Sequence, residues 1–322
     1  MQPKQSNQPS FYDLAIEKRG ASNPVLETIT LVVDLTEAER RVAATYSQGG
    51  RPACRVGVLL RIMILQHLYG LSDPQAEEQL KDRLSFQKFV QLSAHEAVPD
   101  ETTICRFRQR LIECVLHEQL LELVNKQLEE RGYIVKRTTL VDATLVESSR
   151  KRPNSKVAAE GLAPDADASY TRKYNRSFYG YKAHISSDGQ HQLIRTAVVS
   201  TAKAQDAHLW ERIAPTDTKE IYGDKAYDTK ANKAWMRKRG IRNGVEKKGA
   251  HHIKLTAWDR RNNRRKQGVR RHIERIFAHL KKWQHYRRVR YLGLVRNQLE
   301  LTLKAVAYNL KRLTGIMKTQ SA

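Results

Sequence analysis

Three acidic residues, far apart in the sequence, have neighbours that suit them to binding divalent metal ions. Asp142 lies near the centre of residues 138–148, a short run rich in β-branched residues that predicts a strand. Asp224 ends a second apolar run, and Glu274 lies in the strongly basic segment 270–277. A carboxylate inside a strand is costly to bury unless it is paired or binds a metal. Two metal ions held by such acids can support in-line attack on a phosphodiester.

Each of these acids also has a purely structural explanation. Asp142 could be buried and satisfied by backbone N–H groups, and Asp224 could be a turn residue beside Gly223. Glu274 could be a surface ion-pair partner of the neighbouring Arg and Lys residues, which is common and weak. Spacing alone does not decide, because the chain has 34 acidic residues and therefore many possible triples.

The charge of the chain indicates a polyanionic partner. The 322 residues include 58 Lys and Arg against 34 Asp and Glu, a formal net charge of +24, with a sequence pI near 10.0. Nucleic acid is the usual partner for such a charge. After residue 250 the acids are Asp259, Glu274 and Glu300, among many Lys and Arg residues. We therefore expect the C-terminal part to face the polyanion.

The cysteines and the hydropathy pattern indicate a cytoplasmic protein. Cys54, Cys105 and Cys114 form no CxxC pair and leave an odd thiol, which predicts a reducing compartment without disulfides. Residues 1–10 are polar and unlike a signal peptide. The most apolar run is interrupted by Arg61 and is too short to cross a bilayer, so no membrane association is expected.

The first part of the chain has helical periodicity. Residues 1–50 are weakly patterned, with a short helix predicted at residues 11–18, and residues 51–131 predict a small helical domain. Ser72-Asp73-Pro74 would cap one helix, and Asp100 or Thr102 would cap a long helix that ends at Gly132. This domain could contact DNA in a helix-turn-helix arrangement or serve as a bundle for dimerisation.

The second part predicts a mixed α/β domain. The elements expected in order are a strand at 138–148, a loop at 151–173, a strand at 179–185, a turn at 186–189, a strand at 192–200, a helix at 207–213, a strand at 220–223, a helix at 229–238, a strand at 241–246 and helices to the end. Strands and helices in this order favour a mixed five-stranded sheet with flanking helices.

Three groups of motifs resemble the DDE transposases of bacterial insertion sequences, in the IS-four/IS-five group. The first group comprises Arg51-Pro52, Tyr69-Gly70-Leu71-Ser72-Asp73, Pro99-Asp100-Glu101-Thr102-Thr103-Ile104 and Arg106-Phe107-Arg108. The second comprises Val141-Asp142-Ala143-Thr144, Gly180-Tyr181-Lys182-Ala183-His184 and Gly223-Asp224-Lys225-Ala226-Tyr227. The third comprises residues 270–277, Lys281-Lys282-Trp283, residues 286–293 and Ala307-Tyr308-Asn309-Leu310. Together they cover roughly residues 50–313 in order.

The resemblance implies an RNase H-like catalytic core preceded by a small all-α N-terminal domain. The expected domains are an extension at 1–50, a helical domain at 51–132 and a catalytic domain at 133–322. It also implies two Mg²⁺ ions, for which Mn²⁺ would substitute, held by Asp142, Asp224 and Glu274. The group has a Tyr-x2-Arg-x3-Glu-x6-Lys signature around the Glu, and Gln267 stands here at the Tyr position.

Basic and aromatic residues near these motifs are candidate DNA contacts. The set comprises Arg270, Arg271, Lys281, Lys282, Trp283, Arg287, Arg288, Lys182, Arg106 and Arg108. Each cation could instead belong to a solvated basic face. Trp283 and Trp258 could stack on an unpaired base or pack in the core. Lys182 and His184 could face the metals or serve packing.

The resulting hypothesis is a transposase that binds the terminal inverted repeats of an insertion sequence. It would cut DNA and join a freed 3′-hydroxyl to target DNA. Its partners would be double-stranded DNA at the transposon ends and the target, and the family implies a homodimer associated with the bacterial nucleoid. Two alternatives stay open at this point: an RNase H-like nuclease without strand transfer, and a non-catalytic basic DNA-binding regulator.

Overall fold

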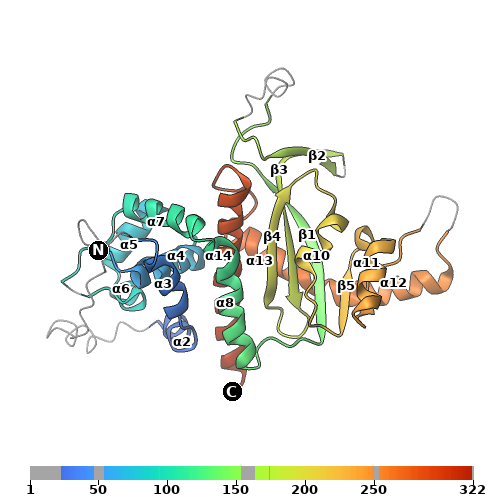
Figure 1. Ribbon diagram of the computed structural model, residues 1–322, viewed down its shortest axis with the longest axis horizontal. Helices are drawn as coiled ribbons and strands as arrows, with labels where there is room; N and C mark the ends of the chain where they lie inside the picture. Colours follow the sequence, from blue (N-terminus) through green and yellow to red (C-terminus); the bar gives the residue numbers. More distant parts are fainter. Residues whose placement is uncertain are drawn as a thin grey trace. The chain divides into compact units, whose positions relative to one another are not determined.

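The protein forms two compact units (Figure 1). The computed structural model describes residues 23–46, 54–93, 95–153, 164–173, 175–249 and 254–320. One unit comprises Met1–Gln127 with Val306–Ala322, and the other comprises Leu128–Ala305. The sequence placed everything after residue 132 in the catalytic domain, whereas residues 306–322 group with the helical unit. The expected helix at 11–18 lies outside the described residues.

The first unit is helical in its described parts. It contains α2 (Pro24–Val32), α3 (Thr36–Ala43), α4 (Val56–Tyr69), α5 (Asp73–Asp82), α6 (Leu84–Val90), α7 (Glu101–Glu113), most of α8 (Leu116–Glu130) and the end of α14 (Leu294–Gln320). Helix α4 is buried on nearly all sides and forms the centre of the core. Ser72 caps α5 in a capping box with Gln75, which confirms the predicted helix start.

A break between α7 and α8 replaces the single long helix predicted from the sequence. Asp100 caps α7 as expected, by accepting a hydrogen bond from the Thr103 N–H at 2.6 Å. The helix stops at Cys114, and Val115 adopts a left-handed backbone with φ of 59°. The apolar stripe continues across this break, so periodicity in the sequence did not reveal it.

The second unit is organised around a mixed six-stranded sheet. Its strands are β1 (Thr138–Glu147), β2 (Ser169–Lys173), β3 (Arg176–Asp188), β4 (Ile194–Thr201), β5 (Glu220–Gly223) and β6 (Arg242–Asn243). Strand β1 pairs antiparallel with β3 and parallel with β5, which pairs parallel with β6. On its other side β3 pairs antiparallel with β2 and β4. This arrangement is an RNase H-like core, as the resemblance implied.

The sheet differs from the predicted one in three places. The expected loop 151–173 ends in the extra strand β2, which pairs with the first part of β3. Strand β3 continues through Asp188, so the turn follows at Gly189 rather than occupying residues 186–189. The last strand is two residues long, although the backbone beyond it stays beside β5, because the Glu246 N–H donates to the Gly223 carbonyl at 3.0 Å.

Helices and a buried core hold the central strands in place. The helices are α10 (Trp210–Ile213), α11 (Lys230–Lys238), α12 (Ala257–Arg270) and α13 (His272–Trp283). Side chains from β1 and β5, including Val141 and Ile221, pack with Trp210, Trp235 and Met236. In Figure 1, α11 and α12 lie on the side of β5 away from β1. This core fixes the parts of β1 and β5 that carry or precede the acids.

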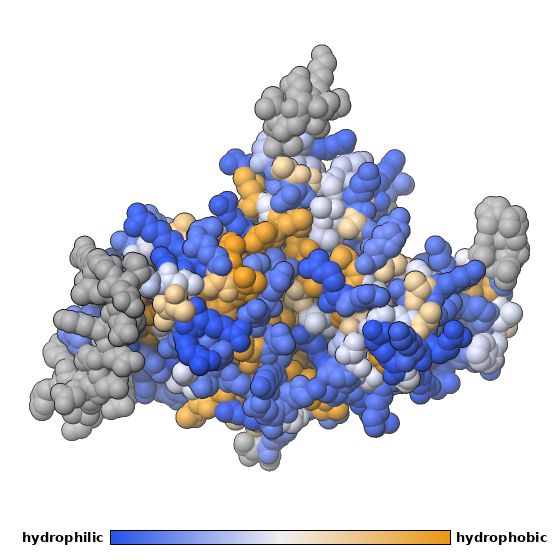
Figure 2. Space-filling model, viewed as in Figure 1, coloured by the Kyte–Doolittle hydropathy of each residue, from blue (hydrophilic) through white to orange (hydrophobic). Residues whose placement is uncertain are grey.

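The face seen in Figure 2 is largely hydrophilic, which agrees with the net charge of +24, and a hydrophobic region lies near its centre. Across the described parts of the chain, each helix is too short or too polar to cross a membrane.

Replacing Gly180 with Ala should destabilise the sheet unit strongly. Gly180 has φ of 154°, and an added Cβ would approach the Val146 carbonyl oxygen and lie 2.5 Å from the Ser148 nitrogen. Neither backbone atom can move without breaking β1 from β3. We expect a loss of about 2–4 kcal/mol, seen as a thermal unfolding midpoint lower by roughly 5–10 °C. Gly268→Ala, in an open position of α12, is the control and should stabilise by up to about 1 kcal/mol. Equal midpoints for the two variants would contradict this account.

Candidate active site

Asp142, in the middle of β1, and Asp224, directly after β5, lie side by side where the parallel pairing of the two strands ends. Val141 and Gly223 are direct partners in the β1–β5 ladder, and the two acids follow them. Neighbouring strands are about 4.8 Å apart, and residues in register point to the same face. The charge of Asp224 raises the pKa of Asp142, which agrees with this proximity. The sheet therefore presents two carboxylates at one position.

Local backbone contacts orient each carboxylate. The Asp142 Oδ1 accepts a hydrogen bond from the Ala143 N–H at 2.8 Å. Asp224 caps a short 3-10 helix, Lys225–Tyr227, and accepts from the Lys225 N–H at 2.6 Å. Each carboxylate therefore keeps a second oxygen to offer to a cation.

Arg270 at the end of α12 bridges Asp142 and a third acid, Glu246. Its Nη1 lies 2.5 Å from the Asp142 Oδ2, and its Nε lies 3.1 Å from the Glu246 Oε1. The guanidinium is 12 % exposed. The sequence interpretation did not single out Glu246. The signal that could have found it is that the predicted strand 241–246 ends in an acid, as the run ending in Asp224 does.

The environment of Asp142 disfavours its charged form. Burial is the main cause, and the neighbouring charge of Asp224 adds to it, while Arg270 and the Ala143 N–H act in the opposite direction. The net result raises the pKa of Asp142 to about 6. Two carboxylates on adjacent strands need a nearby cation to be charged together.

Further cations gather beside the two carboxylates. Lys281 on α13 donates to the Thr144 Oγ1 on β1 at 2.6 Å. Burial lowers the pKa of Lys281, and the positive charges of Arg287 and Lys173 lower it further, so these three cations lie close to one another. The charge of Lys173 also acts on Asp142. Lys173 was missed in the sequence because it falls at the end of a segment predicted to be a loop.

Glu274 lies on the helix that packs against β1, without joining the acidic pair. It occupies the first turn of α13 and is exposed. Arg271 keeps right-handed helical angles between α12 and α13. Glu274 therefore shares a helical face with Arg270, four residues before it, and Lys281, seven residues after it. Among the described residues, no three His, Cys, Asp or Glu side chains are grouped closely enough to hold a metal ion.

The other predicted DNA-binding residues divide into exposed and paired cations. Exposed side chains comprise Arg106, Arg271, Lys282, Arg287 and Arg288, the last 3.3 Å from Glu147. Arg108, predicted as a DNA contact, is instead buried and bound to Asp73 at 2.5 and 3.0 Å. Lys182 is held by Asp206 at 2.8 Å and by the Ala204 carbonyl at 2.6 Å. Internal contacts therefore hold both Arg108 and Lys182.

The aromatic and histidine candidates also have clear positions. Trp258 and Trp283 are 70 % and 57 % exposed, so the alternative that they pack in the core is wrong. His184 is fully buried, and its Nε2 lies 2.8 Å from the Ser200 Oγ. Burial lowers the pKa of His184 to about 4, so this side chain is neutral and serves packing.

Family comparisons agree with this fold. A transposase domain model (DUF772) matches residues 14–110, and a transposase DDE domain model matches residues 134–310. The second match covers more than half of the chain and includes Asp142, Asp224 and Glu274. The chain therefore belongs to the DDE transposase family. Its members transpose DNA, which they bind, and they generally use divalent metals.

The residues of the acidic pair fit a divalent metal. Oxygen donors of Asp142 and Asp224 suit a hard cation. In the structure, the Arg270 guanidinium supplies a positive charge directly on the Asp142 oxygen. A positive charge thus already neutralises the Asp142 carboxylate at this point of the site, and a metal ion bound there would do the same.

Asp142→Asn should stabilise the metal-free protein at high pH. Because burial raises the pKa of Asp142 from 3.8 to about 6, the folded protein binds more protons there than the unfolded chain between these values. Its stability therefore falls as pH rises through this range. We expect the Asn variant to be more stable by about 1–3 kcal/mol at pH 8 in a chelator, and the difference to vanish near pH 4. Thermal unfolding across pH measures it.

Asp217→Asn is the control of opposite sign. Burial alone would raise the pKa of Asp217, but hydrogen bonds from Lys136 and Arg195 outweigh it, and the net shift is downward. This variant should lose stability at pH 8, and the loss should disappear as pH falls through the folded-state pKa of this carboxyl. The same sign for both variants would contradict the burial argument for Asp142.

Proposed function

We propose that this protein binds the terminal inverted repeats of an insertion sequence and catalyses Mg²⁺-dependent DNA cleavage and strand transfer. Asp142, Asp224 and Glu274 would form the catalytic triad. The observation that carries the proposal is the position of Asp142 and Asp224, which directly follow the paired residues Val141 and Gly223 of two parallel strands, with the Arg270 guanidinium on Asp142. A surface that serves DNA binding alone would gain nothing from two neighbouring acids, since their negative charges repel phosphate.

Asp142 and Asp224 would hold the metal ions together with Glu274. When bound, two such ions activate the attacking oxygen and stabilise the leaving oxygen of a phosphodiester. Glu274 lies one helical turn after Arg270, on the helix that packs against β1, which supports it as the third carboxylate of the site.

The cations around the triad would bind and orient the scissile strand. Arg270 also holds Glu246, so it can release Asp142 and keep its place beside the site. Lys281, Arg287 and Lys173 form a cluster whose mutual repulsion would be relieved by a phosphate. Their positive charge also stabilises negative charge that develops at phosphorus.

Two ends of an element must be processed together, so we propose that the active form is a homodimer. The family supports this assembly. Product analysis distinguishes the remaining alternatives. Labelled end DNA, target DNA and Mg²⁺ should yield joined products for a transposase, cut ends alone for a nuclease, and intact DNA for a regulator.

Removing any carboxylate of the triad should abolish chemistry without abolishing DNA binding. We expect Asp142→Asn, Asp224→Asn and Glu274→Gln each to lower the cleavage rate about 1,000-fold or more, equivalent to about 4 kcal/mol of barrier. Affinity for end DNA, measured in a chelator, should stay within about threefold. Gel analysis of labelled ends gives the rate.

The matched control for Glu274→Gln is Glu211→Gln. Glu211 is likewise an exposed glutamate in the first turn of a helix, here α10. This variant should cleave at the rate of the unaltered protein. If Glu274→Gln also retained full activity, Glu274 would not be the third carboxylate, and Glu246 would become the candidate to test.

Mg²⁺ should stabilise the protein through the acidic pair. At about 100 times its Kd, a ligand that binds the folded state alone adds about 2.7 kcal/mol. We therefore expect Mg²⁺ to raise the thermal midpoint by several degrees in the unaltered protein and in Glu211→Gln. The shift should be lost in Asp142→Asn. An undiminished shift in Asp142→Asn would mean that the ion binds elsewhere.

A further inference from the structure

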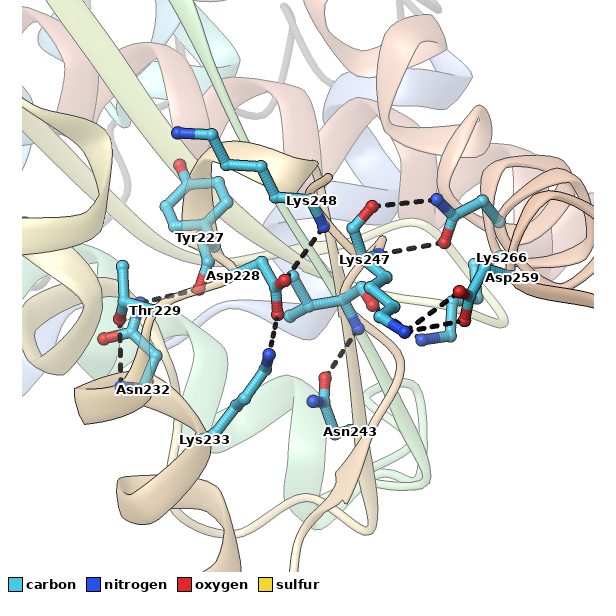
Figure 3. A network of polar contacts seen from close by, with 12 residues as sticks. Tyr227, Asp228, Thr229, Asn232, Lys233, Asn243, Lys247, Lys248, Asp259 and Lys266 are labelled. Atoms are coloured by element: carbon cyan, nitrogen blue, oxygen red, sulfur yellow. Dashed lines mark hydrogen bonds and ion pairs between the residues drawn. The ribbon is translucent and has the colours of Figure 1, made fainter. Parts of the chain in front are cut away.

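One face of α12 is bound to an extended segment, residues 245–248, that follows β6. The Lys266 Nζ donates to the Val245 carbonyl at 2.6 Å. Asn263 accepts from the Lys247 N–H and donates to the Lys247 carbonyl, both at 2.9 Å. The Lys247 ammonium lies 2.9 and 3.0 Å from the two Asp259 oxygens, as Figure 3 shows. Several turns of the helix are therefore fastened to one strand-like segment.

The same segment connects α12 to the acidic pair. Arg270, at the end of this helical face, reaches Glu246 of the segment. The Glu246 N–H in turn donates to the Gly223 carbonyl, directly before Asp224. Lys248 is fixed as well, because its N–H donates to Asp228 at 2.9 Å (Figure 3). The position of α12 relative to Asp142 and Asp224 is thus set by a chain of direct contacts.

The opposite face of α12 carries four exposed arginines. They are Arg260, Arg261, Arg264 and Arg265. Their guanidinium groups make no hydrogen bond or ion pair with a residue in the described parts of the chain. Trp258, 70 % exposed, lies one turn before Arg261 and belongs to the same side of the helix.

This arrangement costs stability in the free protein. Arg260 and Arg264, and likewise Arg261 and Arg265, are four residues apart, and like charges at that spacing repel each other. The four arginines span about 7.5 Å of helix axis, from a rise of about 1.5 Å per residue. Phosphates of one DNA strand follow at about 3.4 Å along the duplex axis. Arginine matches phosphate geometry well, so this face suits about two consecutive phosphates.

We propose that the outward face of α12, formed by Arg260, Arg261, Arg264 and Arg265, is a DNA-backbone binding site separate from the acidic pair. Through residues 245–248 it holds the duplex at a fixed distance from Asp142 and Asp224. The proposal deepens the proposed function, since it takes DNA as the ligand, but it requires no catalysis. It assigns a role to residues outside the motifs of the family resemblance.

The test is the salt dependence of DNA binding by Arg261→Gln/Arg264→Gln. Binding of the full-length protein to a fluorescent duplex of end sequence is measured in a chelator, so that no cleavage occurs. We expect Kd to rise about tenfold near 0.1 M salt. The slope of the logarithm of the binding constant against the logarithm of the salt concentration should become less steep by about two, because each lost phosphate contact contributes about 0.9. In the unaltered protein, DNA should also quench part of the tryptophan fluorescence. That part of the quenching should be absent in Trp258→Phe.

Arg237→Gln/Lys238→Gln is the matched control. It removes the same charge from exposed positions in the last turn of α11. Its Kd should change less than about twofold. If the control weakened binding as much as the α12 variant, net charge alone would explain the effect and the site would not exist. An unchanged salt slope in the α12 variant would also overturn the proposal. If the unaltered protein bound this duplex but did not cleave it, the result would contradict the proposed catalytic triad and not the binding site on α12.

Discussion

The parallel pairing of β1 with β5 is the constraint on which the rest of this site depends. The register that joins Val141 to Gly223 brings Asp142 and Asp224 together, and burial makes their combined charge unfavourable. A positive charge must therefore accompany them. Arg270 supplies it, and the position of Arg270 requires Glu246, the segment after β6 and the full length of α12. Many contacts of the second unit therefore serve to position Arg270 beside Asp142.

The sequence predicted the strand-borne acids and the order of most elements, because these depend on local patterns. Thr138–Glu147 is rich in β-branched residues, and the helix starts at Ser72 and Asp100 have clear capping residues. The family resemblance then added the RNase H-like topology and the expectation that the three acids share two metal ions. Neither Asp142 nor Asp224 could have been chosen from spacing, since their proximity comes from strand register.

The features that the sequence did not predict arise from tertiary contacts. Val115 breaks a helix whose apolar stripe continues past it, and Arg108 looks like a surface cation until Asp73 is seen beside it. Strand β2 forms because the start of β3 offers it an edge. Glu246 and Lys173 join the site through folding of the segments around them. Local composition carries little information about any of these partners.

The Arg270 guanidinium beside Asp142 has a consequence for how the protein folds before it binds metal ions or DNA. A chain that relied on a metal to neutralise its acids would fold only after capturing one, and would depend on the ion supply of its surroundings. Here the counter-charge is built into the polypeptide. Folding of the chain therefore need not wait for an ion to neutralise Asp142. Folding of the protein and binding of the metal ions that catalysis needs can therefore be separate steps.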